Sequence, residues 1–164
     1  MIQDHRQLVR DILPDGYGFD IGCRKDRCKI GRFGVDRFPG PGVDIVCSGD
    51  DLPFESNTLD YISACHLLEH ILSPKKALVE WARVLKESGH LFIVVPDAGR
   101  DLKRAVLYWE HTSWFTLDIL KVLIQSWLGF KIYHLEARDD LADGPMIFCY
   151  STKPENWAKP RMPI

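Results

Sequence analysis

The sequence lacks long hydrophobic runs and a large excess of either charge. No apolar run approaches the roughly 18 residues that a membrane-spanning helix requires, and Met1 to Arg6 form no apolar segment of the signal-peptide type. The basic residues are scattered and the formal net charge is -2, so the charge pattern carries no signal for nucleic-acid or anionic membrane binding. We therefore expect a cytoplasmic protein without a membrane anchor.

The cysteines also lack the paired spacing of a disulfide framework or a zinc site. They are Cys23, Cys28, Cys47, Cys65 and Cys149. Cys23 and Cys28 are close in sequence, but a structural zinc site normally needs a second close pair and none is evident. We expect neither disulfides nor a bound metal.

Hydrophobic periodicity predicts strands that alternate with helices. Strands are expected over residues 17–21, 34–36, 43–46, 59–65, 90–95, 130–135 and 146–150, and helices over 7–13, from Ser73 as N-cap to a stop at Gly89, and over 116–128. This alternation predicts an α/β fold with a mainly parallel sheet covered on both faces. Residues 1–153 are expected to form one domain, and the Pro-rich residues 154–164 a poorly ordered tail.

Acidic residues follow three of the predicted strands. Asp20 and Gly22 end the first strand and Asp36 ends the second. Glycine lets the backbone approach a ligand closely, and an acid at the second strand can accept hydrogen bonds from both ribose hydroxyls. After the third strand, Asp51 can accept from an adenine amino group while the Leu52 amide donates to a ring nitrogen. Each piece alone fits an ordinary turn, but three in order indicate a nucleoside site.

Six short segments carry a family resemblance. They are Asp20-Ile-Gly-Cys, Gly34-Val-Asp, Asp51-Leu-Pro-Phe, Leu59-Asp-Tyr-Ile, His66-Leu-Leu-Glu-His and Ala82-Arg-Val-Leu-Lys-Glu-Ser-Gly-His-Leu. In order and spacing they resemble the class I S-adenosylmethionine-dependent methyltransferases of type 11. The resemblance implies a three-layer, Rossmann-like sheet of seven strands, mostly parallel, whose last strand near residues 146–150 runs antiparallel.

The same resemblance implies the site. Asp20, Gly22 and Cys23 would line the methionine and sulfonium part of the cofactor, Asp36 would hold the ribose, Asp51 and the Leu52 amide would face adenine, and His66 would stand beside the methyl group. The implied function is methyl transfer from S-adenosylmethionine to an unidentified acceptor. For a hydroxyl acceptor, His66 or His111 could take the proton. The plainer interpretation is that these histidines, like Glu69 and His70, orient loops.

Two departures from the family pattern leave other functions open. Arg24 stands where the family has a second glycine, and the interval from Gly22 to Asp36 falls short of the roughly 20 residues of a full first crossover, which predicts a truncated one. A methyltransferase-fold binding module without catalysis is therefore the alternative. A dinucleotide fits less well, because Gly22-Cys-Arg-Lys-Asp-Arg27 holds one glycine of the Gly-x-Gly-x-x-Gly motif. We expect a small-molecule acceptor before a macromolecular one, and leave open a partner chain or homo-oligomer.

Overall fold

The computed structural model describes residues 5–24, 33–139 and 144–161. Within them, one sheet has the strand order β3-β2-β1-β4-β5-β7-β6. The strands are β1 (Gly18–Ile21), β2 (Phe33–Asp36), β3 (Ile45–Val46), β4 (Leu59–Cys65), β5 (Leu85–Pro96), β6 (Lys131–Arg138) and β7 (Met146–Thr152). β7 pairs antiparallel with both β5 and β6, and the other neighbours pair in parallel. The predicted fold class is confirmed.

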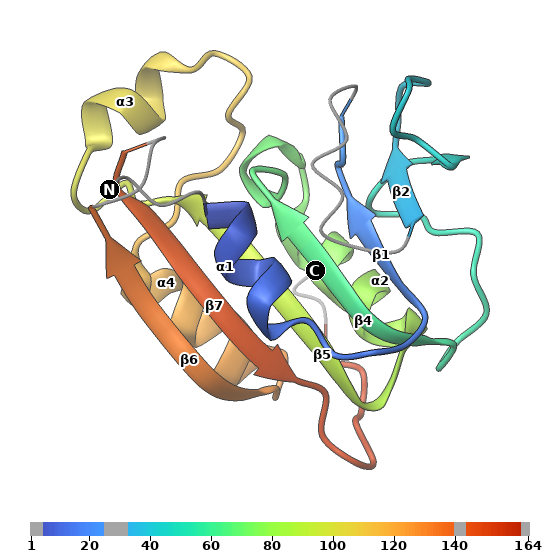
Figure 1. Cartoon of the computed structure of the whole chain (residues 1–164). Coiled ribbons are helices and arrows are strands. Elements are labelled where there is room, and N and C mark those ends of the chain that lie inside the picture. The colour runs from blue at the N-terminus through green and yellow to red at the C-terminus, as the bar shows by residue number, and fades with distance from the viewer. Residues whose placement is uncertain (1–4, 25–32, 140–143, 162–164) are drawn as a thin grey trace.

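Helices cover both faces of the sheet (Figure 1). On one face lies α1 (His5–Ile12), and on the other lie α2 (Pro74–Val84) and α4 (Leu117–Lys121), which continues into the π-helix η2 (Val122–Trp127). Side chains of successive strand residues point to opposite faces of the sheet. In β5, Leu91 and Ile93 pack in the core under α2 and α4, whereas Phe92 packs in the core under α1. The expected three layers are thus present.

The connections on the β2 side of the sheet are short. Turns, without a helix, join β2 to β3 and β3 to β4 in the described chain. The expected truncation of the first crossover falls mainly on residues 25–32, outside the described residues. The remaining helical segments, η1 (Leu68–His70) and α3 (Leu102–Leu107), follow β4 and β5. α3 lies at the end of the molecule toward which the β1 and β4 arrows point (Figure 1).

The predicted stop of the second helix at Gly89 is wrong, because α2 ends at Val84. Its start is as predicted, with Ser73 in the N-cap position and Pro74 first in the helix. At the other end, the amides of Asn57 and Thr58 donate to the carbonyls of Arg83 and Val84 at 3.0 and 2.9 Å. These two hydrogen bonds satisfy carbonyl oxygens of the last helical turn, so the helix does not continue. The next residue, Leu85, pairs with Leu59 of β4.

The segment after β7 is held more firmly than the sequence suggests. Lys153 is buried, and its Nζ donates to Leu85 O and Asn57 Oδ1, both at 2.7 Å. Trp157 packs against the core and donates from Nε1 to Leu128 O at 2.7 Å. Lys153 before the predicted tail and Trp157 within it therefore both contact the rest of the domain. The boundary at residue 153 stays a prediction.

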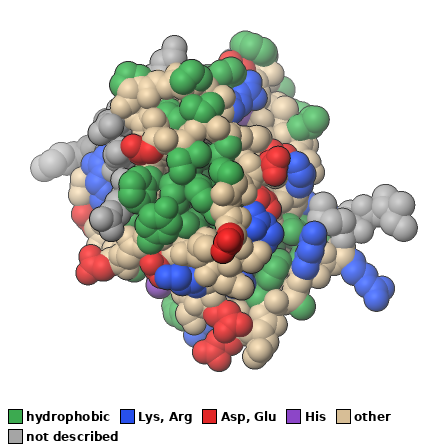
Figure 2. Space-filling model, turned by 90° about the vertical axis from the view of Figure 1, so that its right-hand side faces the viewer, with side chains coloured by type: hydrophobic (Ala, Val, Ile, Leu, Met, Phe, Trp, Pro, Cys, Tyr) green, Lys and Arg blue, Asp and Glu red, His purple; other side chains and the backbone are tan. Residues whose placement is uncertain are grey.

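Hydrophobic side chains gather near the middle of the face that includes β2, with charged side chains around them (Figure 2). At this side of the sheet the rings of Tyr17, Phe19, Phe33 and Phe54 meet with centroid distances of 4.5 to 5.5 Å. The edge strand β3 is only two residues long. Such a short edge offers little backbone for pairing with another sheet.

Two further predictions concern cysteines and membranes. The described cysteines, Cys23, Cys47, Cys65 and Cys149, are all free, and Cys28 lies outside the described residues. Among the helices that the structure describes, none has both the length and the apolar character that crossing a membrane requires.

Candidate functional site

The carboxyl ends of the parallel strands meet at one edge of the sheet, which we call the carboxyl edge. Asp20 of β1 stands in register with Gly34 of β2 and Ser63 of β4. The residues that follow these strands, including Gly22 and His66, therefore come together although they are distant in sequence. In open α/β sheets, ligands bind outside this edge.

Asp20 and Cys23 lie at the end of β1 and are both buried. Ser63 Oγ donates to Asp20 Oδ1 at 3.3 Å. The pKa of the Cys23 thiol is raised to about 12, first by burial and then by the negative charges of Asp20 and Asp36. The thiol is thus protonated and unreactive at neutral pH. Its raised pKa also shows that the carboxylates of Asp20 and Asp36 both lie near it.

Two glycines bring backbone close to the side chain of Leu67. Gly22 has a φ of +75°, and a Cβ there would lie 2.9 Å from Leu67 Cδ1. Gly49, which follows β3, would place a Cβ 3.2 Å from Ile21 Cγ2 and 3.4 Å from Leu67 Cδ2. Gly49 was not among the predicted site residues, although it is a glycine just past a strand end. Both positions offer bare backbone at the carboxyl edge.

The Asp36 carboxylate is fixed by two backbone amides. Oδ2 accepts from Arg24 N at 2.9 Å and Oδ1 accepts from Phe38 N at 3.0 Å. A carboxylate oxygen has two lone pairs, so each oxygen can accept a further hydrogen bond from a ligand. Asp36 therefore has the orientation and capacity of a ribose acceptor.

His66 follows β4 directly and has a left-handed backbone, with a φ of +53°. Its amide donates to Val94 O at 2.9 Å, which holds it between β4 and β5. The Nδ1 atom lies 3.5 Å from Glu69 Oε1. The half-buried imidazole thus stands at the carboxyl edge with one nitrogen toward a carboxylate.

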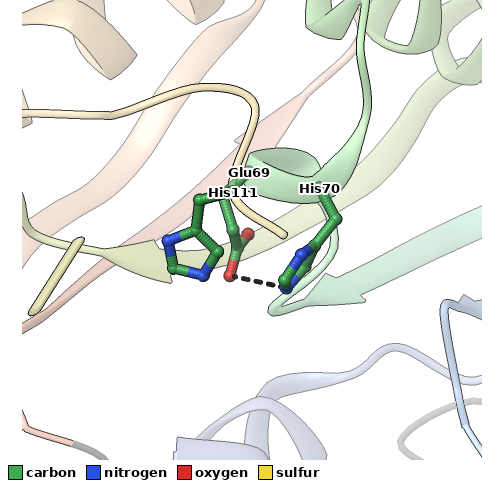
Figure 3. A group of neighbouring side chains, drawn as sticks. All are labelled: Glu69, His70 and His111. Atoms are coloured by element: carbon green, nitrogen blue, oxygen red, sulfur yellow. Dashed lines mark ion pairs between the residues drawn. The ribbon is translucent and has the colours of Figure 1, made fainter. Parts of the chain in front are cut away.

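Glu69, His70 and His111 form a compact group that we call the Glu69 cluster (Figure 3). One ligand-type atom from each side chain lies within 4.8 Å of the other two. His111 comes from the connection between α3 and α4, so only the fold brings it to Glu69 and His70. The two predicted histidines, His66 and His111, both border Glu69, a buried acid that was expected only to orient a turn.

Comparison with known proteins agrees with this geometry. Residues 30–93 match the methyltransferase domain family. The ubiquinone/menaquinone biosynthesis C-methyltransferase UbiE of Bordetella parapertussis is 29% identical over 135 residues, which cover 80% of this chain and 47% of that protein. The chain is therefore similar to the class I methyltransferases in this segment and in its fold. It spans about half the length of this relative.

Solved structures share the methyltransferase fold over most of the chain. A possible histamine N-methyltransferase from Thermotoga maritima has a TM-score of 0.70 at 21% identity, covering 90% of this chain and 87% of that one. A chain from the Haloferax volcanii complex of the Trm112 methyltransferase activator with a methyltransferase has a TM-score of 0.75 at 14% identity, covering 93% and 89%.

The predicted adenine contact of the Leu52 amide stays a prediction, and in this structure the amide has another partner. The Leu52 amide donates to Glu80 Oε1 at 2.9 Å, so a carboxylate of α2 already occupies the donor. Asp51 is exposed one turn beyond the strand end, with its amide bonded to Ser48 O. The residues directly after β3 are Cys47, Ser48 and Gly49, and a Cβ at Gly49 would lie 3.2 Å from Ile21 Cγ2 of β1. A contact from Asp51 to adenine stays a prediction.

The backbone of Arg24 has a conformation that suits the glycine which the family resemblance leads us to expect at this position. Arg24 has a φ of +56°, in the left-handed region that glycine adopts without a steric penalty. The Arg24 amide donates to Asp36 Oδ2 at 2.9 Å.

Arg24→Gly is expected to be more stable than Arg24→Ala by about 1 kcal/mol, because glycine alone relieves the left-handed strain while both variants remove the exposed side chain. Urea denaturation of the two purified variants measures the difference. Equal stability of the two would contradict strain at this position.

A cleft of about 510 Å³ lies beside α3 and is lined by Asp101, Lys103, Leu107, Tyr108 and Trp109. The Tyr108 ring stacks on the His111 ring with centroids 5.3 Å apart. The cleft is therefore next to the Glu69 cluster. Trp109 is 88% exposed and offers an aromatic surface at the mouth.

Proposed function

We propose that this chain transfers the methyl group of S-adenosylmethionine to an acceptor molecule. The observation that carries the proposal is the pair of acids Asp20 and Asp36 beside Gly22 at the carboxyl edge of a methyltransferase fold. The ligand that suits this edge is a cation that carries hydroxyl groups. A phosphate would meet repulsion from the two carboxylates.

Different residues of the chain suit different parts of the cofactor. Asp20 supplies a buried negative charge for the cationic methionine end, and Asp36 supplies acceptors for the ribose hydroxyls. Gly22 and Gly49 let the side chain of Leu67 pack directly against the backbone at the carboxyl edge. When bound, the cofactor supplies a methyl group on a positively charged sulfur, which needs little further activation.

The role of the protein is then mainly to align the acceptor and, for a hydroxyl, to take its proton. With Nδ1 of His66 facing Glu69 at 3.5 Å, the favoured neutral tautomer carries its proton on Nδ1. Nε2 is then the atom that accepts a proton. His111 is the second candidate, at the border of the cleft beside α3.

Isothermal titration with S-adenosylmethionine, S-adenosylhomocysteine and NAD tests the cofactor assignment. Saturable binding of the first two without NAD binding is expected. Binding of none of them would favour the alternative, a domain that has kept the fold without the cofactor. Binding of NAD alone would overturn the assignment.

His66→Ala is expected to lower kcat by about 100-fold, the low end of what a general base contributes, while the Kd for S-adenosylmethionine changes little. His66→Asn is the companion variant, because asparagine tolerates a left-handed backbone. His134→Ala, on exposed β6, is the control. Equal losses of turnover and cofactor affinity in both His66 variants would assign His66 a structural role.

The acceptor class follows from the cleft beside α3, which has the size of a small-molecule site. UbiE relatives act in ubiquinone/menaquinone biosynthesis by name, and the Haloferax structure contains an activator chain. We infer a small aromatic or apolar acceptor for this chain, because Leu107, Tyr108 and Trp109 line the cleft. A partner chain and a cytoplasmic location stay predictions.

A further inference from the structure

The Glu69 carboxylate is buried in an unusual way. The residue is 1% exposed, and among the described residues neither carboxylate oxygen accepts a hydrogen bond. Its basic neighbours are His66 Nδ1 at 3.5 Å and His70 Nε2 at 3.9 Å, both measured to Oε1. Burying a carboxylate at such distances from its partners costs several kcal/mol. A cation between the side chains would remove this cost.

The His70 ring is oriented like a metal-ligating histidine. Its Nδ1 lies 3.2 Å from the carbonyl oxygen of Glu110, and a carbonyl can only accept, so Nδ1 carries a proton. In the neutral ring, Nε2 then presents a lone pair toward Glu69. A lone pair and a carboxylate repel each other unless a cation lies between them. An N–H donated to a carbonyl is also the usual outer contact of a histidine that binds metal.

His111 is held in place relative to these two residues. The amides of Thr112 and Ser113 donate to Glu69 O at 2.8 and 3.2 Å, and Thr112 Oγ1 donates to Ile71 O at 2.9 Å. The His111 ring meets the His70 ring edge to face, with centroids 4.8 Å apart. Figure 3 shows the Glu69 carboxylate between the two rings. The cluster is therefore preorganised by backbone bonds on both sides.

We propose that Glu69, His70 and His111 bind a divalent cation of the zinc class. Two imidazole nitrogens and one carboxylate oxygen are a ligand set that zinc favours, with a fourth position for water or another ligand, whereas magnesium and calcium prefer oxygen alone. The 3.9 Å between His70 Nε2 and Glu69 Oε1 would shorten to the roughly 3.4 Å that zinc–ligand lengths of about 2.0–2.1 Å impose in a tetrahedron.

His66 becomes an outer partner in this arrangement, because its Nδ1 faces the same Glu69 oxygen. The site does not depend on the proposed cofactor. It lies beside the cleft lined by Tyr108, so its open position could be reached by an acceptor hydroxyl.

Titration of the tag-free, EDTA-treated full chain with Zn²⁺, without S-adenosylmethionine, tests the proposal. Calorimetry is expected to give saturable binding of one Zn²⁺ per chain, and Co²⁺ is expected to give the visible d–d absorption of a tetrahedral site. His70→Ala, His111→Ala and Glu69→Gln should each weaken binding by at least about 100-fold, because removing a direct ligand costs more than the roughly 10–100-fold lost with an outer partner.

The matched control is His134→Ala, since His134 Nε2 and Glu136 Oε1 form an exposed pair 3.2 Å apart on β6. This variant should bind zinc as the unchanged chain does. If Glu69→Gln does not fold, the His111→Ala variant decides, because His111 is half-buried in a connecting segment. Zinc binding that survives both histidine substitutions, or no saturable binding at all, would overturn the proposal.

Discussion

Replacing Asp36 with alanine is expected to weaken S-adenosylmethionine binding by about 100-fold, or about 2.8 kcal/mol, which lies within the range for hydrogen bonds to a charged group. Two backbone amides hold the carboxylate at the end of β2, so it meets a ribose without reorganising. The variant should still fold, because the side chain is at a strand end and outside the core. Calorimetry gives the Kd and circular dichroism checks the fold.

Two comparisons make the Asp36 result specific. Asp36→Asn keeps an acceptor oxygen and loses the charge, so its affinity should fall between that of the unchanged chain and that of Asp36→Ala. Glu155→Gln removes an exposed charge elsewhere and should change nothing. An unaltered Kd in Asp36→Ala would remove the ribose contact from the proposed site while leaving the family assignment intact.

Arg83→Ala is expected to destabilise the fold by about 2–3 kcal/mol, because it strips partners from a half-buried network. Arg83 donates to Glu80, to Leu52 O at 3.1 Å and to Phe54 O at 2.7 Å. The guanidinium also holds the pKa of the Glu80 carboxyl below its usual value, chiefly by hydrogen bonding. Without Arg83, the carbonyls of Leu52 and Phe54 lose this donor, and the Glu80 carboxylate keeps only the Leu52 amide as a donor among the described residues.

Thermal and urea denaturation measure this effect, with an expected fall in Tm of roughly 5–10 °C for a domain of this size. Lys76→Ala is the control on the same helix, since the Lys76–Asp50 ion pair is largely exposed and should contribute little to stability. If both variants lost the same small amount, the Arg83 network would not stabilise the segment between β3 and β4.

A strand could be predicted from the sequence where its own residues, without contacts from distant parts of the chain, determine its bounds. β4 has the predicted bounds, because Leu59 to Cys65 is an apolar run closed by a turn on each side. The end of α2 was not predictable, since Leu85 continues the helical spacing of Trp81 and Ala82. What stops the helix is Asn57 and Thr58, which reach the last carbonyls from a distant part of the chain.

The same distinction applies to the candidate site. Asp20, Gly22 and Asp36 follow strands directly, so sequence order places them at the carboxyl edge. The hydrogen bond from the Leu52 amide to Glu80 was not predictable, because Glu80 lies on α2, 28 residues further along the chain. The Glu69 cluster joins residues from two separate connections, and no local pattern links His111 to Glu69. Its single sequence signal was the presence of acid and histidine side by side at Glu69 and His70.

The position of β7 also has a consequence for biosynthesis. β7 follows β6 in the chain but lies between β5 and β6. A ribosome therefore releases β5 and β6 before the strand that must separate them has been made. During this interval the apolar residues Leu91 to Val95 of β5 present an unpaired edge, which is a template for aggregation. Nascent chains that stall before Met146 should therefore depend on chaperones. The sheet is complete only when β7, the last strand to be synthesised, has inserted between β5 and β6.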